Sequence, residues 1–178
     1  NVPWSSDQGL FAQMHYNIFF NLSTITTVGV QVDHFSFHFS PIMFLFAPFY
    51  AIVKSCLSLL VLTQIAIATT AILIGKLAEE QLNNQRAGIF FTALFLISPS
   101  TVYLSTMGYR LSILAMAFIT GALYAFINER FRLFVAMLIL TALCKEHVVL
   151  VLVPLSGLAL LYRRSSKWWV TPVAFGLA

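Results

Sequence analysis

The chain has 178 residues, of which 60% are hydrophobic and only 9% are charged. A soluble domain usually carries about a quarter charged residues, so this composition excludes an ordinary soluble protein and indicates an integral membrane protein. The net charge of +4 falls largely in short loops and no glycine-rich phosphate-binding motif occurs, so nothing indicates nucleic-acid or nucleotide binding. We therefore expect an all-α, polytopic membrane protein whose helices form a bundle.

Residues 1–55 are predicted to be an external loop with short juxtamembrane or interfacial helices over 8–53. Within this loop, the stretch VDHFSFHFSP at 32–41 places an acid and two histidines among aromatic residues. The apolar run over 41–53 has thirteen residues, which is short for a span, because a helix needs about 20 residues to cross the hydrocarbon core. We therefore expect this run to lie along the membrane surface as an interfacial helix.

Residues 56–178 are predicted to form a transmembrane helical bundle. Three uncharged runs, over 56–75, 87–109 and 111–128, are long enough to cross the membrane as helices. Two shorter apolar stretches flank the charged triplet at 145–147, which should therefore be recessed at or below the membrane surface. We expect spans near 56–77, 87–106, 110–128, 131–145 and 147–163, and the start of another at 168.

The orientation of the bundle follows from the positive-inside rule. With an interfacial helix at 41–53, the loops at 76–86, 129–132 and 163–167 share one side of the cell membrane and carry seven of the ten Lys and Arg residues. This side is predicted to be cytoplasmic. The N-terminal segment, the 98–110 region and the 145–147 triplet then face the external or periplasmic side, together with all four histidines.

Several of these external groups also have an ordinary structural interpretation. Asp7 could cap a helix or a turn. Two histidines four residues apart can share a metal ion, but no zinc-binding pattern accompanies His34 and His38. Lys145 could extend to the interface as a boundary residue, and Arg110 could cap a returning helix.

Four motifs occur in an order that resembles a known family. Residues 7–13 read D-x-G-x-F-x-Q, residues 38–41 read H-F-S-P, Gln64 lies in the next span, and K-E at 145–146 ends a short helix. Over residues 7–164, the chain resembles the prokaryotic predicted multi-pass membrane proteins catalogued as domain of unknown function 2079. It departs from them with Y-R-L-S at 109–112, where the family usually has F-H-P-E, and with K-E-H at 145–147, where the family has K-E-D.

That family is distantly similar to the GT-C glycosyltransferases, multi-helix membrane enzymes that take a sugar from a polyprenyl-phosphate carrier. Those enzymes place an acid in the first external loop and then a proline-containing motif that begins a juxtamembrane helix. Asp7 and residues 38–41 occupy the matching places. The resemblance implies a GT-C-like bundle with a first transmembrane helix before Asn1, so we expect the chain to be a fragment that lacks this helix.

The resemblance implies an inverting transfer of a sugar to an external acceptor, with membrane lipids and a polyprenyl-phosphate sugar as partners. Such a transfer needs a base for the acceptor and positive charge for the departing phosphate. Asp7 is the candidate base, and Arg110 and Lys145 are candidates for binding the phosphate. Five further groups are candidates for orienting the acceptor or binding a divalent cation: Asp33, His34, His38, Glu146 and His147.

Two other function classes stay open from the sequence. A transporter would line its path with charged residues, but the three longest apolar runs carry no charge. A non-catalytic membrane subunit would use the aromatic-rich loop over 32–50 as a docking surface. Because similarity of fold does not establish chemistry, substrate uptake, sugar transfer and co-purification with a partner are the observations that separate these classes.

Overall fold

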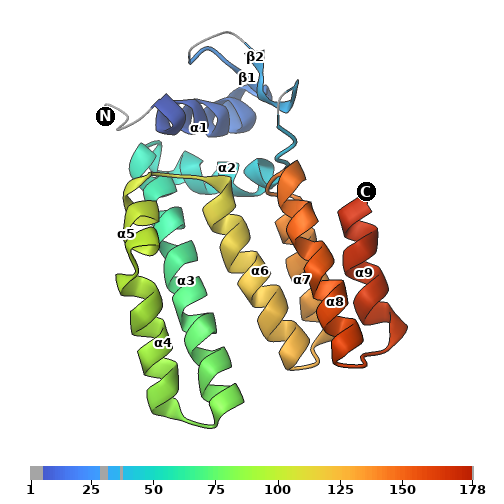
Figure 1. Cartoon of the computed structure of the whole chain (residues 1–178). Coiled ribbons are helices and arrows are strands. Elements are labelled where there is room, and N and C mark those ends of the chain that lie inside the picture. The colour runs from blue at the N-terminus through green and yellow to red at the C-terminus, as the bar shows by residue number, and fades with distance from the viewer. Residues whose placement is uncertain (1–5, 29–31, 37, 178) are drawn as a thin grey trace.

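Nine α-helices make up most of residues 6–28, 32–36 and 38–177, which this computed structural model describes, and the strands in this part are a single pair of two residues each. The all-α class expected from the sequence is thus confirmed. The helices form two parts (Figure 1): an N-terminal layer of residues 6–53 lies across one end of a bundle of residues 56–177.

The N-terminal layer combines two helices with a short hairpin. Its elements are α1 (Ser6–Tyr16), the π-helix η1 (Asn17–Asn21), β1 (Ile25–Thr26), β2 (Val32–Asp33), the 3-10 helix η2 (His34–Ser36) and α2 (Ile42–Val53). The strands pair antiparallel, with Ile25 opposite Asp33. In Figure 1, α1 and α2 both lie across the direction of the bundle helices, so α2 has the orientation that an interfacial helix requires.

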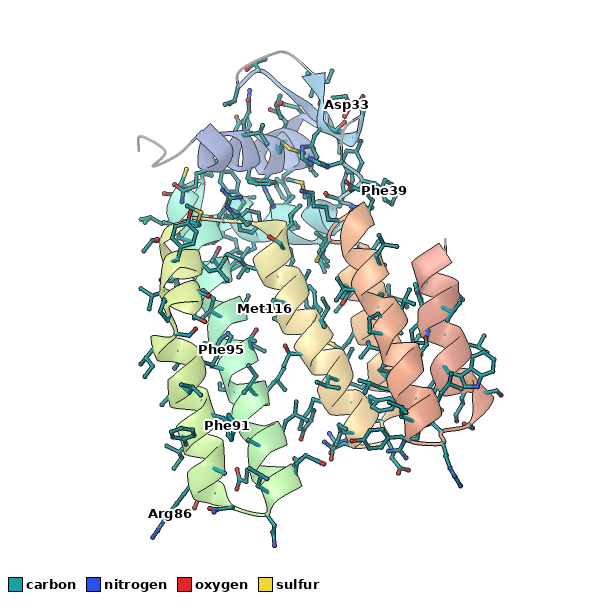
Figure 2. All side chains as sticks on the ribbon, viewed as in Figure 1. Asp33, Phe39, Arg86, Phe91, Phe95 and Met116 are labelled. Atoms are coloured by element: carbon teal, nitrogen blue, oxygen red, sulfur yellow. The ribbon has the colours of Figure 1, made fainter. Side chains whose placement is uncertain are left out.

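The bundle consists of helices that run alternately away from the N-terminal layer and back toward it (Figure 1). They are α3 (Cys56–Leu82), α4 (Gln85–Ile97), α5 (Pro99–Thr106), α6 (Leu111–Ile127), α7 (Phe131–Ala142), the 3-10 helix η3 (Glu146–Leu152), α8 (Val153–Leu161) and α9 (Ser166–Leu177). Figure 2 shows Arg86, in the first turn of α4, at the far end of the molecule from Asp33 and Phe39 of the layer. The segments 107–110 and 143–145 lie at the end that the layer covers.

Local sequence explains the boundaries of α3, α4 and α5. Asn83 ends α3 with a left-handed backbone (φ +47°), which asparagine tolerates better than most residues. The side chain of Asn84 then accepts a hydrogen bond from the backbone N–H of Arg86 at 2.9 Å and caps α4. At the other end of α4, Pro99 cannot continue the backbone hydrogen-bond pattern, and α5 is bent by 54° relative to α4.

Glycines allow α3 and α4 to pack closely. A Cβ atom at Gly75 would lie 2.0 Å from Oγ1 of Thr92, and one at Gly88 would lie 2.9 Å from the carbonyl oxygen of Gly75. Thr92 Oγ1 donates a hydrogen bond to the carbonyl oxygen of Gly88 at 2.9 Å. The two helices are therefore in backbone contact at this point, where a larger side chain has no room.

One apolar core continues from the N-terminal layer into the bundle. Met14 of α1 and Ile42 of α2 are fully buried in the same cluster as Leu59 of α3 and Tyr109 of the α5–α6 loop. The backbone N–H of Ile42 also donates a hydrogen bond to the carbonyl oxygen of Leu143 at 2.9 Å, which joins the start of α2 to the end of α7. The layer is therefore packed and hydrogen-bonded onto the bundle.

Among the described residues, α3 is the one helix that is by itself long and apolar enough to cross a membrane. α4 and α5 pass the same test only when they are taken together across their bend. The remaining apolar helices of 10–17 residues are Ile42–Val53, Leu111–Ile127, Phe131–Ala142 and Leu150–Leu161. The polytopic topology therefore stays a prediction from the sequence.

Candidate functional site

A pocket of about 330 Å³ lies where the N-terminal layer meets the bundle, and we call it the interlayer pocket. Its volume is within the usual range of about 300 to 1,000 Å³ for small-molecule sites. The layer contributes Leu10, Phe11, Thr26, His34, His38 and Ser40, and the bundle contributes Arg110, Leu111, Ser112 and Lys145. Neither part of the fold forms this site alone.

Arg110 is positioned by the loop between α5 and α6. Gly108 in this loop has a φ of +82°, and a Cβ atom there would lie 2.8 Å from Gln8 of α1, so glycine is needed for both the turn and the close approach. The backbone is extended at Arg110, which is the N-cap residue of α6. Arg110 therefore lines the pocket beside a helix N-terminus, where the helix dipole favours anions.

Lys145 reaches the same pocket from the turn between α7 and η3. Its extended backbone (φ −170°) comes directly before η3, so the chain changes direction at this residue. Arg110 and Lys145 are 35 positions apart in the sequence, and the α6–α7 hairpin between them returns the chain to the end that the layer covers. The hairpin thus explains why both cations line one pocket.

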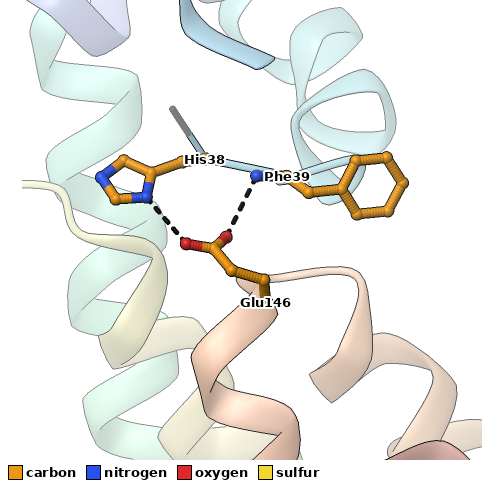
Figure 3. Close-up of polar contacts among 3 residues, drawn as sticks. All are labelled: His38, Phe39 and Glu146. Atoms are coloured by element: carbon orange, nitrogen blue, oxygen red, sulfur yellow. Dashed lines mark hydrogen bonds and ion pairs between the residues drawn. The ribbon is translucent and has the colours of Figure 1, made fainter. Parts of the chain in front are cut away.

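Glu146 connects the bundle to the N-terminal layer (Figure 3). Its Oε1 accepts a hydrogen bond from Nδ1 of His38 at 2.8 Å, and its Oε2 accepts one from the backbone N–H of Phe39 at 3.0 Å. Desolvation alone would raise the pKa of this carboxyl, but the hydrogen bonds from His38 and from the backbone outweigh it and lower the pKa of Glu146 to about 2. Glu146 is therefore ionised at neutral pH.

Among the polar atoms of pocket-lining residues, Nε2 of His34 and Oγ of Ser40 are buried without a hydrogen-bond partner in the described part of the chain. Burial, followed by the charges of His38 and Lys145, lowers the pKa of His34, so this imidazole is neutral at pH 7. Buried polar groups are nearly always bonded to protein, water or a ligand. The two atoms are therefore able to receive a polar ligand.

Aromatic rings form one wall of the interlayer pocket. Phe11 packs edge-on against Tyr109, with ring centroids 5.3 Å apart, and its centroid lies 6.2 Å from that of His34. Tyr109 does not line the pocket itself, and burial raises the pKa of its phenol, so it stays neutral. The apolar lining residues Leu10, Phe11 and Leu111 lower the local dielectric constant, which strengthens electrostatic interactions in the pocket.

The charges around the pocket favour an anion. Arg110 and Lys145 are its fixed cations, and no Asp or Glu lines it among the residues that the structure describes. The carboxylate of Glu146 is bound to His38 and to backbone. A guanidinium can bind a phosphate through two parallel hydrogen bonds and an ammonium acts as a point charge, so this pair suits a phosphate group.

The structure brings five of the eight predicted site residues together: His34, His38, Arg110 and Lys145 line the pocket, and Glu146 is bound to His38. Asp33 does not line it, because its Oδ1 accepts the backbone N–H of Phe35 at 3.0 Å and stabilises the local turn. Asp7 belongs to α1 and His147 to η3, but their side chains lie outside the described ones, so their roles stay predictions.

The predicted divalent-cation site has no support in the geometry of the described residues. Within that part of the chain, no group of three or more His, Cys, Asp or Glu side chains is arranged to hold a metal ion. His34 and His38 do lie close, with ring centroids 5.7 Å apart, but Asp33 is engaged in its own turn. Arg110 and Lys145, and not a bound metal ion, are therefore the positive charges that the described geometry supports.

Some pocket residues were missed in the sequence. Phe11 and Ser40 belong to the D-x-G-x-F-x-Q and H-F-S-P motifs, so their position in a motif was a usable signal. Thr26 of the hairpin and Ser112 of α6 belong to no such motif, and only the fold places them at the pocket. Conversely, the external histidine His15 is fully buried in α1 and does not line the pocket.

Comparison with known proteins gives one family. The family described as "Predicted membrane protein (DUF2079)" matches residues 3–178 of the chain. No match was found among curated proteins or among solved structures. The matched range includes the N-terminal layer, the bundle and every residue that lines the interlayer pocket.

Proposed function

The chain belongs to the DUF2079 family of predicted membrane proteins, and from this premise we propose that it is a multi-pass membrane enzyme of the glycosyltransferase type. In this proposal, a sugar moves from a polyprenyl-phosphate carrier to an acceptor on the external side of the cell membrane. The interlayer pocket binds the phosphate of the carrier, and the N-terminal layer faces the external side.

One observation carries the proposal: Arg110 and Lys145 line a single pocket together with Nε2 of His34 and Oγ of Ser40, which have no hydrogen-bond partner among the described residues. When the bond between a sugar and a carrier phosphate breaks, negative charge grows on the phosphate oxygen. Fixed cations and hydrogen-bond donors beside a low-dielectric wall stabilise such developing charge. The pocket offers these groups without a competing carboxylate among its described lining residues.

The position of the pocket also suits a donor that is a lipid. Ser40 of the pocket lies two residues before α2, whose exposed side chains include Phe44, Leu45, Ile52 and Val53. An apolar helix that lies across a bundle end is suited to the membrane interface, where lipid headgroups are found. A phosphate bound in the pocket would then lie at headgroup depth while the polyprenyl tail stays among the acyl chains.

The proposal is tested with the complete protein in liposomes that contain a panel of polyprenyl-phosphate sugars, with release of the carrier phosphate as the readout. We expect release from at least one donor, with a strong decrease in Arg110→Gln and in Lys145→Gln. Lys54→Gln is the matched control, because Lys54 is an exposed cation at the end of α2, outside the pocket.

Absence of release from every donor, with the wild-type protein shown to be folded, would overturn the proposal. Release that Arg110→Gln and Lys145→Gln leave unchanged would also contradict it, because the transfer would then take place elsewhere. An equal loss in Lys54→Gln would attribute the effect to general surface charge and would likewise remove the pocket from the mechanism.

A further inference from the structure

We propose that His38 is the catalytic base that deprotonates the acceptor hydroxyl, with Glu146 as its positioning residue. This inference rests on the proposed function and assigns the proton transfer within the same site. It follows from the contact between the H-F-S-P motif, which contains His38, and the K-E-H motif, which contains Glu146. The contact joins residues 108 positions apart.

The geometry fixes the tautomer and the direction of the imidazole. A carboxylate oxygen can only accept a hydrogen bond, so Nδ1 of His38 carries the proton in the 2.8 Å bond to Glu146. In the neutral ring, Nε2 is then the unprotonated nitrogen that can accept a proton. Figure 3 shows this second ring nitrogen pointing away from Glu146.

Glu146 is itself held in place by a second contact. Its other oxygen accepts the backbone N–H of Phe39 at 3.0 Å, so the carboxylate cannot rotate without losing one of its two bonds. Because the pKa of Glu146 is lowered to about 2, the carboxylate stays charged while the imidazole takes up a proton. An ionised, oriented carboxylate behind an imidazole stabilises the imidazolium that forms.

The proposed base and its positioning residue are accessible to an acceptor from the aqueous side. His38 and Glu146 each have 43% of their side chains exposed, whereas Ser40 and His34 of the same pocket are buried. An acceptor from the aqueous side thus meets His38 first, while the carrier phosphate binds to Arg110 and Lys145. His38 and the two cations line the same pocket, so one bound sugar can meet both the base and the phosphate site, as a displacement at the sugar carbon requires.

In the proposed reaction, each bond that forms is matched by one that breaks. Nε2 of His38 takes the proton of the acceptor hydroxyl, and the acceptor oxygen forms a bond to the anomeric carbon of the sugar. The bond from that carbon to the phosphate oxygen breaks, and its electron pair stays on the phosphate, which Arg110 and Lys145 hold. The imidazolium afterwards releases its proton to water, so no oxidant, reductant or further reactant is required.

Several charged or titratable groups surround His38, and each can affect the pH dependence of the reaction. Glu146 faces it from η3, His34 from η2 with ring centroids 5.7 Å apart, and Arg110 and Lys145 share its pocket. Glu146→Gln removes the carboxylate from this set and leaves the two cations and His34 in place, so the variant tests the contribution of Glu146 alone.

The experiment measures the pH dependence of carrier-phosphate release by the complete protein in liposomes. We expect His38→Gln to lose about 10²-fold or more in kcat, with the KM for the donor changed by less than about threefold, because it removes proton transfer and not phosphate binding. Glu146→Gln should keep part of the activity and shift the acid limb of its kcat/KM profile to lower pH, because the imidazolium has lost its anion. Glu79→Gln, an exposed carboxyl at the far end of the bundle, is the matched control.

Two results would overturn the inference while the proposed function stands: full turnover by His38→Gln, or an acid limb that Glu146→Gln leaves in place. Loss of the acid limb in Asp7→Asn but not in His38→Gln would assign the base to Asp7 instead. If His38→Gln does not fold, as judged by its thermal unfolding midpoint, the shift in Glu146→Gln decides alone. Absence of release by the wild type is a different result, which removes the proposed function itself.

Discussion

The imidazole of His15 packs edge-on against the phenol of Tyr109, with ring centroids 5.4 Å apart and neither residue exposed to solvent. Nδ1 of His15 donates a hydrogen bond to the carbonyl oxygen of Phe11 at 2.7 Å, while Nε2 is buried without a partner among the described residues. Desolvation lowers the pKa of His15 from 6.5 to about 4 although the bond to Phe11 opposes this shift. The fold therefore requires a neutral histidine in the core beside Tyr109.

The first prediction concerns stability in mild acid. Between pH 6.5 and 4 the unfolded chain protonates His15 and the folded chain does not, so the free energy of unfolding decreases as the pH falls through this window. The contribution of His15 is at most about 3 kcal/mol. His15→Phe should reduce the decrease, as measured by thermal unfolding midpoints in detergent at pH 7 and pH 5.

The buried His34 contributes in the same direction, because its pKa is also lowered, so the dependence should shrink in His15→Phe and not vanish. Glu146 acts at lower pH: its stabilising contribution is lost as the pH falls from about 4.5 toward 2. Identical decreases between pH 7 and pH 5 in His15→Phe and wild type would show that His15 does not need to be neutral in the fold.

The second prediction distinguishes the two cations of the pocket. Arg110→Gln should weaken binding of a polyprenyl phosphate by roughly 10- to 100-fold, because a hydrogen bond to a charged group contributes about 1.5 to 3 kcal/mol. Arg110→Lys should recover only part of this loss, since an ammonium cannot form the paired contact of a guanidinium. Titration of the lipid phosphate into nanodisc-embedded protein measures both, and full recovery by Lys would mean that Arg110 acts as a charge alone.

The third prediction concerns Ser40, whose hydroxyl is buried and unpartnered among the described residues. Ser40→Ala removes this unsatisfied group, so the ligand-free protein should be as stable as wild type or more stable by up to about 1 kcal/mol. Binding of a polyprenyl phosphate should nevertheless weaken severalfold, because the ligand loses a donor. Reduced stability together with unchanged binding would show that the hydroxyl serves the fold and not a ligand.

The fourth prediction tests the contact between α3 and α4. A methyl group at Gly88 would lie 2.9 Å from the carbonyl oxygen of Gly75, so Gly88→Ala should destabilise the protein by about 1 to 3 kcal/mol. Gly157 of α8 has no atom within 4 Å of the equivalent position, so Gly157→Ala should be neutral or stabilising by up to about 1 kcal/mol. Unfolding midpoints of the two variants provide the comparison, and equal midpoints would contradict close packing.

The fifth prediction tests the proposed topology. In a protein without Cys56 and Cys144, cysteines at the exposed positions Ser36 and Gln85 should react with a membrane-impermeant maleimide from opposite sides of the membrane. Ser36 belongs to the N-terminal layer and should react in intact cells, whereas Gln85 should react only after the membrane is opened. Labelling of both from the same side would overturn the orientation.

The helices and the cationic residues could be predicted from the sequence because both signals are local. Apolar runs indicate helices, and Arg110 and Lys145 stand out in a chain with 9% charged residues. The contact of His38 with Glu146 could not be predicted, because nothing local relates residues separated by 108 positions. The positive-inside rule predicted that both residues lie on the external side, and only the fold made them partners.

In two places, a local backbone requirement competes with the role that the wider sequence pattern predicts. Asp33 carries chemistry that suits a site, but its carboxylate is used by the nearest backbone N–H, as often happens with aspartate in turns. The uncharged run over 87–109 has the length of one span, yet Pro99 divides it into two helices with a 54° bend. In both cases a local hydrogen-bond requirement overrides the wider pattern.

The hydrogen bond from Ile42 to Leu143 couples the position of α2 to the position of the interlayer pocket. α2 begins two residues after Ser40 of the pocket wall, and Leu143 precedes Lys145 by two residues, so the helix and the pocket share one anchoring point. If α2 lies at the interface between water and acyl chains, the pocket stays at a constant depth relative to the headgroups. Bilayers of different thickness would then tilt or stretch the far end of the bundle, while a lipid phosphate would always meet Arg110 and Lys145 at the same level.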